Sequence, residues 1–172
     1  MPDKMDKPEK NISPKFKVMV IDDDEQILNL LGSFFTMKGY DVTTYPDGSY
    51  ALDDDKLGEY DVVISDLNMP EVDGLTVLKH TKELNEDIVC IIVSGMATLD
   101  SAIKALRSGI DDFIVKPFDL SQLRVVIERN LRTVMLKREN EALQKAIIHE
   151  RDQLRRSNTE LKTINEMLLS LE

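Results

Sequence analysis

The sequence lacks the features of a secreted or membrane-embedded protein. Its 172 residues include one cysteine, so no disulfide can form within the chain, and Cys90 lies in the apolar stretch IVCIIV as a small buried side chain would. No apolar run approaches the roughly 18 residues of a membrane span. Residues 1–15, MPDKMDKPEKNISPK, lack the apolar core of a signal peptide. We therefore expect a cytoplasmic protein with no membrane partner, in which residues 1–15 form a disordered tail.

The sequence also has fewer basic than acidic residues. The chain has 22 basic against 32 acidic residues and a formal net charge of −10. This balance disfavours a broad contact with the phosphate backbone, so we expect no direct nucleic-acid binding by this chain. The length, with 42% hydrophobic residues, suffices for one domain with its own core plus an extension, whereas two full domains would be cramped.

Short β-branched runs alternate with helical patterns from Phe16 onward. The strand-like runs are FKVMVID, DVTTY, DVVISD, DIVCIIVS and DFIV. Apolar residues at helical spacing predict the intervening helices near residues 27–35, 49–57, 74–84, 102–106 and from Asp119. Strict alternation with short turns predicts an α/β fold, a doubly wound parallel sheet of five strands with helices on both faces. A glycine follows three of the helices, where a left-handed residue commonly ends a helix: Gly39, Gly58 and Gly109.

The last predicted helix continues into a long regular extension. No glycine or proline occurs between Phe118 and Glu172. A seven-residue rhythm places Leu136, Leu143, Glu150, Ser157, Ile164 and Leu171 at heptad position d, and Asn140, Ile147, Leu154, Leu161 and Leu168 at position a. Glu150 and Ser157 weaken the middle, and a polar Asn140 is typical of a parallel two-stranded coil. We predict a domain of residues 16–134 followed by a dimeric coiled coil of residues 135–172; the alternative is a helix lying on its own domain.

Polar residues stand where the predicted strands end. Aspartates follow the first strand and end the third, while a serine and a lysine end the fourth and fifth: Asp22, Asp23, Asp24, Asp66, Ser94 and Lys116. Because these strands are central neighbours in a doubly wound sheet, we expect the polar groups to converge in one crevice. Taken alone, Asp66 could simply begin a turn.

Carboxylates that converge in this way need positive charge nearby, because like charges several Å apart repel by roughly a few kcal/mol at an effective dielectric near 20. Lys116 provides one positive charge. A Mg²⁺ ion, which favours carboxylate and carbonyl oxygens, would provide the rest. Such a cluster can accept a phosphoryl group, since lysine and metal neutralise the phosphoryl oxygens while a carboxylate attacks in line.

Four motifs carry a resemblance to a known family. The pair Asp22–Asp23, SDLNMP with Asp66, VSG with Ser94 and KPF with Lys116 occur in this order. Together they resemble the signature of the response-regulator receiver domain of two-component signalling, over about residues 16–131. The resemblance implies a flavodoxin-like (CheY-like) sheet with strand order 2-1-3-4-5, part of a bacterial-type phosphorelay.

The resemblance also implies a set of site residues. Asp66 would be the phosphoacceptor, phosphorylated by a sensor histidine kinase. Asp22, Asp23, Asp66 and the main-chain carbonyl of Asn68 would bind Mg²⁺ or Mn²⁺. The chain would then be a stoichiometric phosphoacceptor rather than an enzyme, and would pass its signal to the dimeric coil or to an output domain beyond this sequence.

Further roles follow from the same resemblance. Lys116 would pair with one phosphoryl oxygen, and the Ser94 hydroxyl would bond another. Coupled movement of Ser94 and Phe113, the aromatic switch position, would carry the signal to the face of the fourth helix, fifth strand and fifth helix. Asn68 and Met96 occupy positions that modulate the lifetime of the acyl phosphate. Because an apolar Met96 should hinder attack by water, we expect a long lifetime.

Two other functions remain open. An aspartate-dependent phosphatase would use the Asp-x-Asp spacing of Asp22 and Asp24, but it leaves SDLNMP unexplained, and no cap insertion is visible. An adaptor would dock without phosphorylation and act through its coiled coil. The receiver interpretation explains more of the motifs than either alternative.

Overall fold

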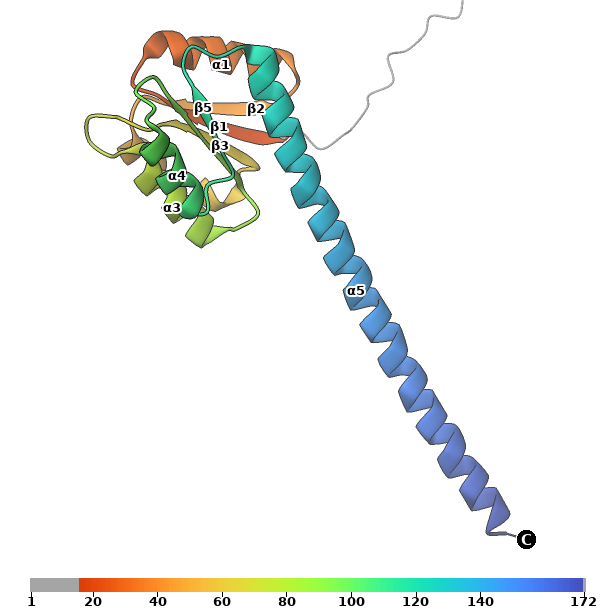
Figure 1. Cartoon of the computed structure of the whole chain (residues 1–172). Helices are drawn as coiled ribbons and strands as arrows, with labels where there is room; N and C mark the ends of the chain where they lie inside the picture. Colours follow the sequence, from red (N-terminus) through yellow and green to blue (C-terminus); the bar gives the residue numbers. More distant parts are fainter. Residues whose placement is uncertain (1–15, 172) are drawn as a thin grey trace, which may run out of the picture. The chain divides into compact units, whose positions relative to one another are not determined.

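The structure is a computed structural model that describes residues 16–171 (Figure 1). The predicted tail, residues 1–15, lies outside the described residues. The chain divides into two units, the first ending at Leu131 and the second beginning at Arg132. No helix within residues 16–171 is both long enough and apolar enough to cross a membrane.

The first unit is built on five parallel strands in the order β2-β1-β3-β4-β5. The strands are β1 (Lys17–Ile21), β2 (Asp41–Tyr45), β3 (Val62–Asp66), β4 (Val89–Ser94) and β5 (Asp112–Val115). The helices are α1 (Glu25–Met37), α2 (Gly48–Leu52), the 3-10 turn η1 (Leu57–Glu59), α3 (Gly74–Leu84), α4 (Leu99–Arg107) and α5 (Leu120–Leu169). Figure 1 shows α1 on one face of the sheet, and α3 and α4 on the other. The predicted fold class and strand order are confirmed.

Two of the three inner strands, β3 and β4, show why the sheet forms. Every residue of β3 and β4 is buried, and both strands are rich in valine and isoleucine, whose branched side chains pack well on a pleated surface. Full burial of each such side chain contributes about 1.5–3 kcal/mol. Cys90 is buried in β4 without a disulfide partner, as predicted. The edge strand β2 carries only partly buried and exposed residues.

Side chains and glycines fix the ends of the helices. The side chains of Asp24, Asp73 and Thr98 accept backbone N–H groups in the first turns of α1, α3 and α4. Gly39 and Gly109 follow α1 and α4 with φ of 89° and 86°, which confirms the predicted left-handed stops.

The helix predicted near residues 49–57 is present but shorter than predicted. Helix α2 is five residues long, and Gly58 lies within η1 with no left-handed conformation. The reason is Asp54, whose Oδ2 accepts hydrogen bonds from the hydroxyls of Tyr45, at 3.2 Å, and Tyr60, at 3.0 Å. Its other oxygen accepts a backbone N–H two residues on, which competes with helical hydrogen bonding.

Helix α5 has 50 residues and belongs to both units. In the first unit Leu123, Ile127 and Leu131 are buried. In the second unit the predicted heptad leucines and isoleucines are each more than half exposed. Helix α5 contains every predicted coiled-coil position up to Leu168, and Leu171 lies just beyond its end. The pairing of two such helices stays a prediction.

Candidate functional site

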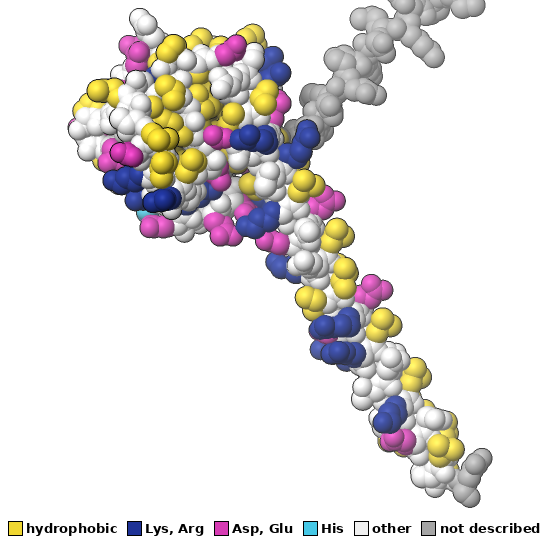
Figure 2. Space-filling model, in the orientation of Figure 1, with side chains coloured by type: hydrophobic (Ala, Val, Ile, Leu, Met, Phe, Trp, Pro, Cys, Tyr) yellow, Lys and Arg dark blue, Asp and Glu magenta, His cyan; other side chains and the backbone are white. Residues whose placement is uncertain are grey.

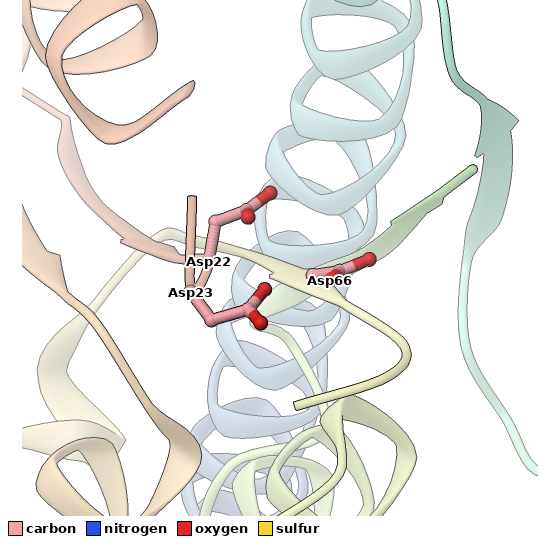
Figure 3. A group of neighbouring side chains, drawn as sticks. All are labelled: Asp22, Asp23 and Asp66. Atoms are coloured by element: carbon pink, nitrogen blue, oxygen red, sulfur yellow. The ribbon is translucent and has the colours of Figure 1, made fainter. Parts of the chain in front are cut away.

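Three carboxylates meet at the carboxyl edge of the sheet. Asp22 and Asp23 directly follow β1, and Asp66 is the last residue of the adjacent strand β3. One oxygen from each lies within 4.8 Å of the other two, and Figure 3 shows the three side chains grouped at this edge. Asp22 and Asp66 are buried, whereas Asp23 is exposed. The predicted convergence of these aspartates is therefore present in the structure.

Lys116 joins this cluster from the segment after β5. Its Nζ lies 2.6 Å from Oδ2 of Asp22 and 3.7 Å from Oδ1 of Asp66. The backbone N–H of Lys116 donates to the carbonyl of Ser94 at 2.9 Å, and the Lys116–Pro117 peptide bond is cis. One cation thus contacts two of the three carboxylates.

One lysine does not balance the local negative charge at Asp66. Burial, together with the charges of Asp22 and Asp23, raises the pKa of the Asp66 carboxyl to about 6. Lys116 and a hydrogen bond from the backbone N–H of Leu67, at 2.9 Å, act in the opposite direction without cancelling the effect. The site therefore favours an additional cation.

The donor set fits a hard divalent ion. Three carboxylates offer oxygen ligands within reach of one point, and the most exposed of them, Asp23, leaves a side open to water. Mg²⁺ prefers oxygen ligands and retains several waters, so it suits a cluster with an open side. The roles of the individual ligands, including the carbonyl of Asn68, stay predictions.

The remaining predicted site residues lie on neighbouring segments. Ser94 is buried at the end of β4, the strand adjacent to that of Asp66, and its Oγ accepts a hydrogen bond from the Met96 backbone N–H at 3.3 Å. Phe113 is a partly buried residue of β5 packed on the core. The side chains of Asn68 and Met96 are exposed, and Met96 retains 80% of its accessible surface.

Asp24 does not join the carboxylate cluster. Its side chain caps α1 by accepting the N–H of Gln26 at 2.9 Å, and its own N–H donates to Oδ1 of Asp22 at 2.9 Å. The pair that a phosphatase of the Asp-x-Asp type would need is thus divided between a helix cap and the cluster. This geometry does not favour the phosphatase alternative.

Sequence reasoning missed two glycines and an aspartate that hold the loop after Asp66. A Cβ at Gly74 would overlap the carbonyl oxygen of Asp66, so only glycine lets α3 begin this close to β3. Buried Asp47 accepts backbone N–H groups from Ser49, at 2.9 Å, and from Glu71 in the same loop, at 3.2 Å. A Cβ at Gly48, next to it, would lie 2.7 Å from the carbonyl oxygen of Val72.

Comparison with known proteins gives the family. The model of the response regulator receiver domain matches residues 18–128, which include the carboxylate cluster and Lys116. The chain belongs to this family. The receiver domain of a two-component response regulator is therefore the function class of the first unit, and phosphoacceptor chemistry is implied by the family.

Curated and structural relatives agree with this assignment. The receiver is 30% identical over 131 residues to the regulatory protein AtoC of Escherichia coli, covering 76% of this chain and 28% of AtoC. It is 32% identical over 116 residues to the transcriptional regulatory protein PrrA of Mycobacterium tuberculosis, covering 67% of this chain and 50% of PrrA. The crystal structure of NtrX from Brucella abortus aligns with a TM-score of 0.69 and 30% identity, over 75% of this chain and 30% of NtrX.

The chain spans half or less of these relatives. Activities of the whole relatives therefore do not transfer directly to it. Since PrrA is named a transcriptional regulator, the absence of nucleic-acid contact also stays a prediction for this chain.

Proposed function

We propose that Asp66 of this receiver accepts a phosphoryl group from the phosphohistidine of a sensor histidine kinase. A carboxylate oxygen of Asp66 forms the new bond to phosphorus while the bond from phosphorus to the histidine nitrogen breaks. The histidine nitrogen keeps the electron pair and returns to neutral imidazole after protonation. The product is an acyl phosphate, so the chain acts stoichiometrically rather than as a classical enzyme.

The observation that supports this proposal is the placement of Asp66 among two acids and one amine. The 3.7 Å approach of Lys116 Nζ to Asp66 lets the ammonium contact an oxygen of the incoming phosphoryl group. Asp22, Asp23, Asp66 and the carbonyl of Asn68 would hold Mg²⁺ or Mn²⁺, which supplies charge neutralisation when bound. Lys116 exchanges its 2.6 Å contact with Asp22 for a phosphoryl oxygen.

The response would begin at Ser94 and Phe113. The buried Ser94 hydroxyl, now bonded to the N–H of Met96, would turn to a phosphoryl oxygen. Added charge of about −1.5 to −2 at a fixed site is enough to bias a two-state element. Movement of Phe113 in β5 would then carry the change toward α4 and α5.

The second unit would act as a homodimeric coiled coil that receives this signal, in the cytoplasm and without direct nucleic-acid contact. Its heptad side chains are apolar and more than half exposed in one chain, which favours burial against a second copy. Two receivers joined by one coil would couple phosphorylation to the packing of the coil, or to an output domain.

The test uses the full chain with a small phosphoryl donor, phosphoramidate, and with beryllofluoride. With Mg²⁺, intact-mass analysis should show one added phosphoryl group, and light scattering should report any change in oligomeric state on adding beryllofluoride. The matched variants are Asp66→Asn and Asp24→Asn, since Asp24 lies beside the cluster but caps a helix. Only Asp66→Asn should lose phosphorylation. Equal labelling of both variants and wild type would refute Asp66 as the acceptor.

A further inference from the structure

Glu150 and Arg151 are adjacent charged residues in the middle of the apolar stripe of α5. With the heptad assigned above, Glu150 takes a core position d and Arg151 the flanking position e. Both side chains are exposed in the single chain. Figure 2 shows hydrophobic side chains recurring along this helix with basic side chains between them. A glutamate at a core position of such a stripe needs a cationic partner.

Neither residue has a suitable partner on its own helix. Side chains three or four residues apart are neighbours on a helix. The positions at these distances from Glu150 carry no cation, and those around Arg151 carry no acid. Arg151 contacts Asp152 at 3.0 Å, but both side chains are about half exposed, and such surface pairs contribute little.

A second copy in parallel register provides the missing partner. In a parallel two-stranded coil, a d side chain fits a hole formed by four residues of the facing helix, at positions a, d, e and the next a. For Glu150 these are Ile147, Glu150, Arg151 and Leu154 of the second copy. We propose that Glu150 of each copy pairs with Arg151 of the other, so that two reciprocal ion pairs lie in one layer of the coil. This inference rests on the homodimer of the proposed function.

Polar layers favour the parallel arrangement over an antiparallel one. In parallel register Asn140 faces Asn140 of the second copy. The two Glu150 side chains share a layer, and each has Arg151 of the other copy beside it to offset their like charge. Two antiparallel alignments match all five a positions with d positions. In them Asn140 would face Ile164 or Leu171, and Glu150 would face Leu154 or Leu161. Burying each polar group against an aliphatic side chain is unfavourable. The a and d residues of α5 therefore favour the parallel register, in which Glu150 lies beside Arg151 of the second copy.

The test reverses the charges and then recombines them. In Glu150→Arg both copies carry two basic residues in this layer, and in Arg151→Glu both carry two acids. Each variant alone should dimerise about tenfold or more weakly than wild type by sedimentation equilibrium, because like charges adjoin across the coil. An equimolar mixture should recover wild-type dimerisation as a heterodimer, since each arginine then meets a glutamate.

Matched controls place the same charge changes on the outer face of the helix. Lys145→Glu and Glu166→Arg lie at heptad position f and should leave dimerisation unchanged, alone or mixed. Leu168→Cys should form an interchain disulfide rapidly only in parallel register, while the parent, whose Cys90 is buried, should not.

The outcomes separate this inference from the proposed function. A dimer that tolerates both reversals, or a mixture that fails to recover, overturns the ion pairs but leaves the coil in place. A wild-type chain that stays monomeric at all concentrations overturns the homodimer and the ion pairs together. Phosphorylation at Asp66 is measured independently and is unaffected by either result.

Discussion

Replacing Asp66 with asparagine should stabilise the fold at neutral pH when no divalent cation is present. The surroundings of Asp66 raise the pKa of its carboxyl from 3.8 to about 6, and the side chain is only 11% exposed, so solvent screening is small. Ionisation in the folded protein is then about 3 kcal/mol less favourable than in the unfolded chain. Asparagine removes this penalty and can still accept the hydrogen bond from the Leu67 N–H.

Because the pKa of Asp66 is higher in the folded than in the unfolded state, the stability gained by Asp66→Asn should increase with pH. Well below pH 3.8 the carboxyl is protonated in both the folded and the unfolded state, so it does not affect the difference in unfolding free energy between Asp66→Asn and wild type. Above about pH 6 it is ionised in both, and the folded state carries the full penalty. The advantage of Asp66→Asn should therefore fall from about 3 kcal/mol near pH 8 to about 0.5 kcal/mol near pH 4.

Urea unfolding in the presence of EDTA measures this difference. Tyrosine fluorescence is a suitable probe, because the chain has no tryptophan and Tyr45 and Tyr60 lie in the first unit. Asp24→Asn is the matched control, since it also removes one acid but asparagine caps a helix about as well as aspartate. Its stability should stay close to wild type. A pH-independent difference between Asp66→Asn and wild type, or a less stable Asp66→Asn, would refute the reasoning.

Three further predictions follow from the same site. Mg²⁺ at about 100 times its dissociation constant should raise the unfolding free energy of wild type by about 2.7 kcal/mol. The increase for Asp66→Asn should be much smaller. Equal increases in urea melts would contradict a role for Asp66 as a metal ligand. Gly74→Ala should destabilise the receiver by about 1–3 kcal/mol or prevent folding. The control Gly95→Ala, whose Cβ would lie an ordinary 3.8 Å from Lys116, should be tolerated. Circular dichroism melts that show equal stability for the two variants would contradict the steric argument. Met96→Glu should shorten the lifetime of the acyl phosphate, since a polar group there would assist water, and equal half-lives in a dephosphorylation assay would exclude this role for Met96.

Much of the receiver could be predicted because its signals are local. The apolar runs of β3 and β4 need no tertiary information to be identified as buried strands. Once a parallel sheet is expected, Asp22, Asp66 and Lys116 fall at the same edge simply because each follows or ends a strand. The 2.6 Å contact between Lys116 and Asp22, which are 94 residues apart, is a consequence of that topology.

The features that escaped prediction depend on contacts between distant segments. Asp54 ends α2 early because Tyr45 and Tyr60, from two different parts of the chain, both donate to it. Asp47 holds the loop after Asp66 through a residue 24 positions away. The only signal in the sequence was the dipeptide Asp-Gly at residues 47–48 and again at 73–74, which marks a turn without saying what it packs against.

The electrostatic penalty at Asp66 would also contribute to the proposed conformational switch. About 3 kcal/mol stored at Asp66 corresponds to a change on the order of 100-fold in an equilibrium constant. Cation binding would relieve that repulsion, and it can shift a conformational equilibrium only by as much as the affinity for the cation differs between the two states. Phosphorylation would place a group of about −1.5 to −2 charge at Asp66, which the cation and Lys116 would have to balance. A full reversal from 1:99 to 99:1 needs about 5.5 kcal/mol, so Asp66 alone would not suffice. In the proposed function, contacts of Ser94 and Lys116 with the phosphoryl group would provide the remainder, and removing either should leave a phosphorylated but only partly switched receiver.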